Sequence, residues 1–143
     1  MPDLMLRYDM RQPAFSQVSR TKMYQAALEQ CRWGELNGFT SVHISEHHGA
    51  EDGYLPAPLI FASAVASRTR SLMMYISALI APLHDPVQLV EDLTVLDIIS
   101  EGRVIPIISA GYRQEEFAAV GKTLADRRDY MESIGPFLNR AWT

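Results

Sequence analysis

The chain has 143 residues, of which 48% are hydrophobic and 21% charged, which is enough apolar material for the core of one domain but not of two. A formal net charge of −4 gives no electrostatic reason to expect nucleic acid as a partner, and no apolar run approaches the roughly 20 residues of a membrane span. Residues 1–10 lack the basic-then-apolar layout of a signal peptide, and the single cysteine, Cys31, excludes an internal disulfide. We therefore expect a cytoplasmic protein.

The first 68 residues predict two strand–helix units in succession. A strand at Leu4–Tyr8 is followed by a helix over residues 20–37, and Gly38 can adopt the left-handed conformation that ends this helix. A second strand at Ser41–Ser45 is followed, after a long polar loop, by a helix over residues 59–68.

The next 41 residues predict two more strands around a third helix. The strand at Leu72–Ile80 is almost continuously apolar, as expected when both faces of a parallel strand are covered. Asp85 followed by Pro86 is a typical helix start, and the helix it begins ends before Gly102. The fourth strand covers Arg103–Ser109.

The remaining segment predicts a short helical turn at residues 115–120 and a last helix over residues 124–139. Gly135-Pro136 lies inside that helix, so we expect a kink or break there. The whole chain, residues 1–143, thus predicts a single α/β domain of four βα units. We expect a parallel sheet in the order 1-2-3-4, joined by right-handed crossovers.

The loops that follow the four strands are the candidate sites, because α/β barrels place their active sites at the carboxyl ends of the strands. Glu46-His47-His48-Gly49 directly follows the second strand, and neighbouring side chains at a strand end point in opposite directions. One imidazole can therefore face the site and exchange a proton near neutral pH. A purely structural loop with locally satisfied polar groups is equally consistent with this sequence. A metal site built from these residues with His43 or His84 is the weaker interpretation, and we predict none.

Two other polar positions have competing interpretations. His84 ends the third strand segment, where a packing role in a tight turn is favoured over catalysis. Arg127 and Arg128 open the last helix and could hold a phosphate or carboxylate, although an exposed arginine pair is more often merely solvated.

Several motifs together resemble the bacterial luciferase-like monooxygenase family, in matching order and spacing up to Arg128. They are Gly38-Phe39, SEHHG, PAPLIFASAVASRTRSL, APLHDPVQLVEDLTVLDIISEGR and GYRQEEF. The resemblance implies a TIM-type (β/α)₈ barrel of about twice this length, of which this chain would form a half-barrel truncated relative to the family. It also implies a flavin-dependent monooxygenase that uses reduced FMN and O₂ on a small organic substrate such as an aldehyde or sulfonate. Hydride transfer with a deazaflavin coenzyme is the alternative that the family offers.

The resemblance also assigns site residues. His47, the first histidine of the EHH triplet, would be catalytic, near the flavin and substrate. Ser77-Ala78 corresponds to a non-prolyl cis peptide, and Arg128 to an arginine that contacts the cofactor phosphate. The cofactor-binding residues implied are Ser77, Ala78, Ser109, Gly111 and Arg128. We further expect His47 to be the ring most exposed to the barrel mouth and His48 to be more constrained by loop contacts.

This chain departs from the family in two places. Ala110 precedes Gly111 where luciferase has an arginine, and the fourth strand reads VIPIIS with Pro106 where relatives usually carry Phe and Gly. The second half of the barrel, with most phosphate-binding loops, is absent from this sequence. The chain could therefore be part of a full monooxygenase, a natural half-barrel that pairs with a copy of itself or with a separately encoded half, or a non-catalytic relative.

Assembly follows from the open sheet that four strands would make. We expect the barrel-lining face to be apolar and to be buried in a homodimer, since bare strand edges and faces promote association. The residues expected on that face are several of Leu72, Met74, Ile76, Ala78 and Ile80, with Val104 or Ile105 and Ile107 or Ile108. Pro106 lacks an N–H and so favours an edge position for the fourth strand, hence two half-barrels face to face.

Overall fold

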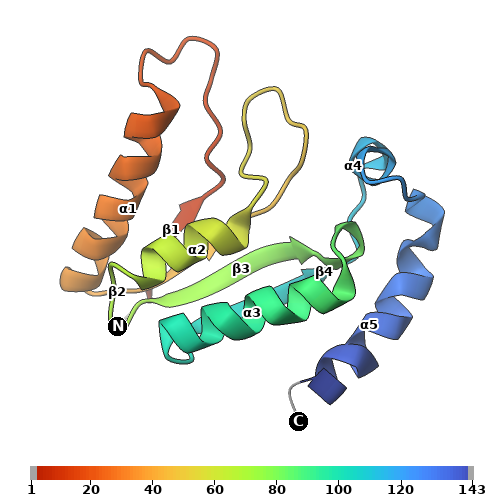
Figure 1. Cartoon of the computed structure of the whole chain (residues 1–143). Helices are drawn as coiled ribbons and strands as arrows, with labels where there is room; N and C mark the ends of the chain where they lie inside the picture. The colour runs from red at the N-terminus through yellow and green to blue at the C-terminus, as the bar shows by residue number, and fades with distance from the viewer. Residues whose placement is uncertain (1–2, 142–143) are drawn as a thin grey trace.

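A computed structural model describes residues 3–141 as four strands alternating with helices (Figure 1). The elements are β1 (Leu4–Tyr8), α1 (Arg20–Leu36), β2 (Phe39–Ile44), α2 (Pro58–Ala66), β3 (Met73–Ile80), η1 (Ala81–Leu83), α3 (Pro86–Ser100), β4 (Val104–Ser109), α4 (Gln114–Ala119), η2 (Leu124–Asp126) and α5 (Arg127–Ala141). The strands form one sheet in the order β1-β2-β3-β4, and every neighbouring pair is parallel. The predicted α/β class, strand order and parallel pairing are confirmed.

Helix α3 shows how the sequence sets an element's limits. The Asp85 side chain accepts hydrogen bonds from the backbone N–H groups of Val87 (2.9 Å) and Gln88 (3.0 Å), and Pro86 occupies the first turn, where its missing N–H costs nothing. At the other end Glu101 adopts a left-handed conformation with φ of 57°. This helix positions the turn that carries His84 at the carboxyl end of β3.

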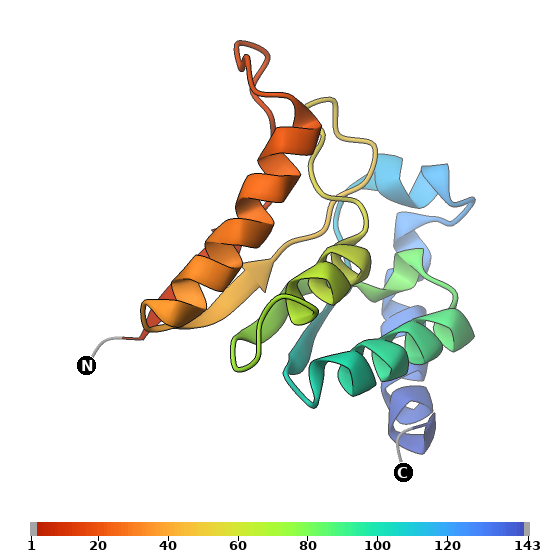
Figure 2. The same cartoon turned by 60° about the vertical axis from the view of Figure 1, so that its left-hand side comes forward.

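Helices α1, α2 and α3 cover one face of the sheet, and the core lies between them and the strands (Figure 2). Leu72, Met74 and Ile76 are fully buried in this core, together with Val42 and Ile44 of β2. The expectation that these β3 residues line the open, barrel-facing side is therefore wrong, because they point toward the helices.

The opposite face of the sheet carries the side chains that alternate with this core set. The strand register places Arg7, His43, Tyr75 and Ile105 in one row across it. His43 and Tyr75 stack with ring centroids 4.8 Å apart, and Arg7 is exposed. This face is consequently more polar than the sequence suggested.

The last helix differs from its prediction. Helix α5 continues through Pro136 to Ala141, so the expected break is not found. Pro136 lies on the exposed side, as does Glu132 four residues earlier, so the carbonyl that loses its helical partner can bind water instead. None of the helices within residues 3–141 combines the length and the hydropathy that crossing a membrane requires.

Candidate active site

Residues of β1, β3 and β4 and of the loops after β2 and β4 line an open cavity of about 180 Å³ at the carboxyl end of the sheet. The lining residues are Arg7, Ser45, Glu46, His47, Tyr54, Ser77, Ala78, Ile80, Ser109, Gly111 and Tyr112. Five of the six residues that the sequence proposed as site residues therefore lie together, although they come from three different strand ends. They are His47, Ser77, Ala78, Ser109 and Gly111.

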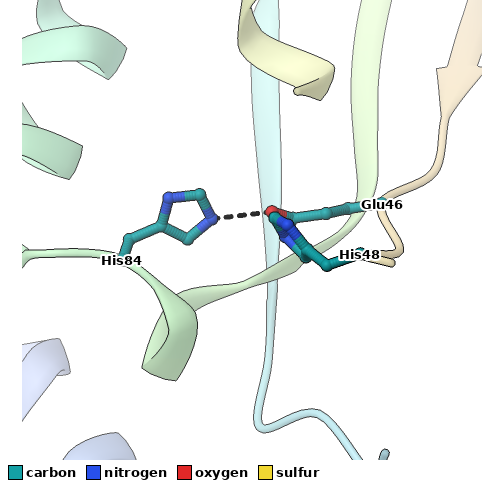
Figure 3. Close-up of side chains that lie close together, drawn as sticks. All are labelled: Glu46, His48 and His84. Carbon is teal, nitrogen blue, oxygen red and sulfur yellow. Dashed lines mark hydrogen bonds and ion pairs between the residues drawn. The ribbon is translucent and has the colours of Figure 1, made fainter. Parts of the chain in front are cut away.

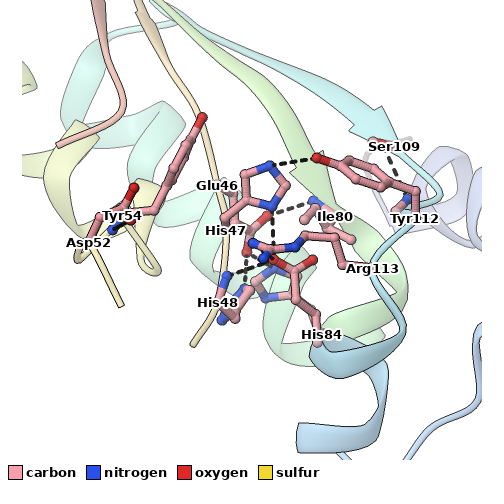
Figure 4. A network of polar contacts seen from close by, with 12 residues as sticks. Glu46, His47, His48, Asp52, Tyr54, Ile80, His84, Ser109, Tyr112 and Arg113 are labelled. Atoms are coloured by element: carbon pink, nitrogen blue, oxygen red, sulfur yellow. Dashed lines mark hydrogen bonds and ion pairs between the residues drawn. The ribbon is translucent and has the colours of Figure 1, made fainter. Parts of the chain in front are cut away.

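The His47 ring is held from several sides. Its Nδ1 lies 2.8 Å from Oε1 of Glu116, and its Nε2 lies 3.5 Å from the Tyr112 hydroxyl, which the dashed line in Figure 4 joins to it. The rings of Tyr54 and Tyr112 meet the imidazole edge to face, with centroids at 4.6 Å and 5.7 Å. The imidazole is thus fixed with one nitrogen toward a buried carboxylate and the other toward the cavity.

Glu116 is the residue that fixes His47, and the sequence did not single it out. Its side chain is buried, and Oε1 also accepts a hydrogen bond from the backbone N–H of His48 at 3.0 Å. The Arg113 guanidinium lies 3.6 Å from the same oxygen. Because Oε1 acts as an acceptor for these donors, Nδ1 is the ring nitrogen assigned a proton, and in the neutral imidazole Nε2 is then the acceptor. In the sequence, Glu116 is the second of two adjacent glutamates in the motif QEEF, and nothing there distinguishes it from Glu115.

A second buried carboxylate, Glu46, binds the other two histidines of the site. Its Oε1 accepts hydrogen bonds from Nε2 of His48 (2.8 Å) and of His84 (2.7 Å), and Oε2 accepts one from the backbone N–H of Ile80 (2.6 Å). Burial alone would raise the pKa of Glu46. The hydrogen bonds from His48 and His84, the charge of His84 and the Ile80 N–H outweigh that effect and lower the pKa to about 2. The hydrogen bond to Glu46 in turn raises the pKa of His48.

Of the two adjacent histidines, His47 lines this cavity and His48 does not, as expected for the ring that faces the mouth. In total exposure the order is the reverse, because the side chain of His47 is 17% exposed and that of His48 27%. Both are constrained, each by its own glutamate. His84, for which a packing role was favoured, also takes part in this polar network.

Two further expectations concern the cofactor. The Ser77-Ala78 bond is a non-prolyl cis peptide, as predicted, and both residues line the cavity. Arg128 is not among the residues that line this cavity. Its side chain is 83% exposed, and it pairs with Glu132 one helical turn away at 2.9 Å.

Residues 10–143 match the family described as luciferase-like monooxygenase. The chain belongs to this family. The alpha chain of alkanal monooxygenase from Photorhabdus laumondii is 30% identical to it over 116 residues, which cover 81% of this chain and 32% of the relative. The oxygenase component of a flavin-dependent trigonelline monooxygenase from Acinetobacter baylyi is 25% identical over 101 residues, covering 71% and 28%.

The fold agrees with solved structures of the same kind. Monooxygenase RslO1 from Streptomyces bottropensis matches with a TM-score of 0.87 at 25% identity, over 97% of this chain and 42% of that one. This luciferase-like chain thus spans less than half of that structure and about a third of the length of the curated relatives it matches.

Proposed function

We propose that this luciferase-like chain provides the catalytic face of a flavin-dependent monooxygenase, in which reduced FMN and O₂ oxidise a small organic substrate. The observation that carries the proposal is the fixed orientation of His47 in a cavity shared with Ser77, Ala78, Ser109 and Gly111. The family match and the flavin dependence in the name of the trigonelline relative support it.

The residues beside His47 suit the flat ring of a flavin. Ser77, Ala78, Ser109 and Gly111 have small side chains at the ends of β3 and β4, which leaves room for a ring close to the backbone. Reduced FMN, when bound, supplies the electrons that activate O₂.

The phosphate of FMN requires a positive charge away from the ring, and Arg128 is the proposed contact. Its pair with Glu132 lies at the surface, where such pairs contribute roughly 0–1 kcal/mol. A phosphate can therefore replace Glu132 as the partner of Arg128 at little cost.

His47 is the proposed proton-transfer group. With Nδ1–H donating to Glu116, Nε2 is the acceptor that faces the cavity and Tyr112, so it can take a proton from a substrate atom bound there. Glu116 is the positioning residue, since it fixes the tautomer and the ring plane. Tyr54 and Tyr112 shield the ring edge from water.

The test combines flavin binding with turnover. FMN binding to the purified chain is followed by flavin fluorescence, and oxidation of a long-chain aldehyde is followed with reduced FMN and O₂. His47→Gln should lower kcat by about 100-fold or more, the usual contribution of a proton-transfer group. The Kd for FMN should change little. Glu29→Gln, which changes an exposed side chain on α1 that does not line the cavity, is the control.

Each outcome bears on a different part of the proposal. Equal turnover by wild type and His47→Gln would remove His47 from the mechanism. Binding of a deazaflavin coenzyme in preference to FMN would replace the cofactor, and binding of neither would support a non-catalytic half-barrel. Glu116→Gln should lower kcat and shift its pH profile with little change in KM, whereas a merely structural glutamate would leave the profile of the folded enzyme unchanged.

The open face of the sheet also bears on function. We propose that the row of Arg7, His43, Tyr75 and Ile105 is covered by a second copy of the chain or by a second half-barrel, with the homodimer preferred. Pro106 lies on the outermost strand of the sheet, where a missing N–H is tolerated.

A further inference from the structure

Three potential metal ligands converge beside the His47 site. Glu46 lies just beyond β2, His48 two residues further along, and His84 just after η1 (Figure 3). One carboxylate oxygen and two imidazole nitrogens of these residues lie within 4.8 Å of one another. His47 does not belong to this group, because its ring is bonded to Glu116.

The donor set is one that divalent transition metals prefer. Two imidazole nitrogens and a carboxylate oxygen are a common protein set for Zn²⁺ and Co²⁺, with water completing the coordination. Metal–nitrogen and metal–oxygen bonds of about 2.0–2.2 Å place neighbouring tetrahedral ligands about 3.3–3.6 Å apart. The Glu46 oxygen now lies 2.8 Å and 2.7 Å from the two nitrogens, so each distance would have to widen by about 0.5–0.9 Å.

The surroundings anchor the carboxylate and leave the rings accessible. The Glu46 side chain is fully buried, and its second oxygen is held by the backbone N–H of Ile80, a contact that orients a ligand from behind. The rings of His48 and His84 are 27% and 25% exposed, so an ion can enter and water can complete its shell. Of the charged groups nearby, Glu116 accepts the His48 N–H and favours a cation. Lys122 bonds the His84 carbonyl at 3.1 Å and opposes one.

We propose that Glu46, His48 and His84 form a binding site for a divalent transition metal such as Zn²⁺, separate from the His47 centre. At present both Nε2–H groups donate to the same carboxylate oxygen. A bound ion displaces these two protons and takes both nitrogens and the oxygen as ligands. It thereby ties the loop after β2, which borders the cavity, to the turn that follows β3. From the sequence a metal site that includes His84 was the weaker interpretation, because His84 lies 36 residues from His48 and only the folded chain brings the two rings together.

The experiment titrates the metal-free chain with Co²⁺ at about pH 7.5 and follows the visible absorption of the ion, with Zn²⁺ as competitor. One equivalent should bind and give a tetrahedral spectrum that Zn²⁺ abolishes. His84→Gln should weaken binding by at least the roughly 10–100-fold that loss of a supporting residue costs. His47→Gln and His43→Gln are the matched controls and should bind as wild type does. Affinity should fall on lowering the pH to about 6, since protons compete for the imidazoles.

A second measurement covers the case in which His84→Gln fails to fold. In the ¹⁵N spectrum of the histidine side chains of the wild-type protein, Zn²⁺ should shift the Nε2 signals of His48 and His84 and leave those of His47 and His43 in place. The proposal is overturned if no saturable one-to-one binding occurs, if His43 or His47 is the residue whose signal shifts, or if a folded His84→Gln variant binds as tightly as wild type. Each of these results would leave the cluster as a hydrogen-bond network only.

Discussion

Replacing Glu46 with glutamine tests whether the buried carboxylate is held ionised by its partners. The substitution keeps the size of the side chain and removes its charge, while His48, His84 and the Ile80 N–H remain in place around it. A pKa lowered from 4.5 to about 2 corresponds to about 3 kcal/mol of stability, because each pKa unit is equivalent to about 1.4 kcal/mol. Glu46→Gln should lower the free energy of unfolding of the metal-free chain by about this amount.

The effect has a defined pH dependence. Because the folded-state pKa of Glu46 is depressed, its contribution is present above the unfolded pKa near 4.5 and is lost as the pH falls toward 2. His48 behaves oppositely: its raised pKa gives a contribution that is complete below about pH 6.5 and is lost as the pH rises through the folded value. Both contributions are therefore present between about pH 4.5 and 6.5, which is where the variant should differ most from wild type.

The assay is urea unfolding of wild type and Glu46→Gln at about pH 5.5 and about pH 3. The difference in stability should be about 3 kcal/mol at the higher pH and about 1 kcal/mol at the lower one. Glu132→Gln, which removes an exposed carboxylate paired with Arg128, is the control and should change stability by less than about 0.5 kcal/mol. A Glu46→Gln difference that is small at pH 5.5, or equal at both pH values, would refute the account of Glu46 as an anion stabilised by its histidines.

Three further outcomes are expected. Gly111→Ala should lower the stability of the chain by more than Gly38→Ala does. Both glycines have positive φ, which costs an alanine roughly 1–2 kcal/mol, but of the two only Gly111 would bring a Cβ to 2.7 Å from a neighbouring isoleucine methyl. Equal losses of stability in thermal unfolding would contradict this. Cys31 should not react with a thiol reagent at about pH 8 until the chain unfolds, because its side chain is fully buried and burial raises the pKa of its thiol to about 12. Rapid labelling of Cys31 in the folded chain would disprove this prediction. Sedimentation equilibrium should show that the wild-type chain is a dimer. Ile107→Asp on β4 should weaken this dimer, whereas Ile98→Asp on α3 should not. A stable wild-type monomer at micromolar concentration would exclude the dimer.

The sequence predicted elements well where local chemistry determines them. Asp85-Pro86 begins a helix by capping, and β1 has the predicted limits Leu4–Tyr8. For Pro136 the same local reasoning predicted a kink or break, and the break is not found because the helix continues past it. Its consequence depends on whether the carbonyl of Glu132 is open to water, which is a property of how α5 packs on the rest of the chain.

The local sequence did not determine which residues of β3 point toward the helices and which point to the opposite face of the sheet. MMYISALI is apolar almost throughout, so it contains no alternation from which to assign inward and outward positions. Only the neighbouring strand and the helices show which residues of β3 face the core. Met74 lies beside Val42 in the helix-covered core, whereas Tyr75 lies beside His43 on the other side.

The candidate site was predictable in its histidines but not in what holds them. The position of the EHH triplet at a strand end marked a histidine pair, and the family resemblance singled out His47 and added small residues at two other strand ends. Glu116 comes from a six-residue helix 69 positions away, and His84 meets Glu46 across 38 positions. Contacts over such separations are set by the tertiary packing of the loops, which periodicity and turn signals do not describe.

The two buried glutamates, Glu46 and Glu116, hold the side chains of the EHH triplet in two neighbouring clusters. Successive side chains at the end of β2 diverge, so Glu46 and His48 turn to one side and His47 to the other. Glu46 collects the rings of His48 and His84, while Glu116 takes the His47 ring and the His48 backbone N–H. The backbone of residues 46–48 joins the two clusters directly, and His48 is bonded to both carboxylates, by its ring to Glu46 and by its backbone N–H to Glu116. The two clusters are therefore coupled: besides the hydrogen bond to Glu46, the charge of Glu116 also raises the pKa of His48. A change in the charge of the Glu46 cluster, by protonation or by a bound ion, thus acts on the Glu116–His47 pair both through this hydrogen-bonded peptide and through space.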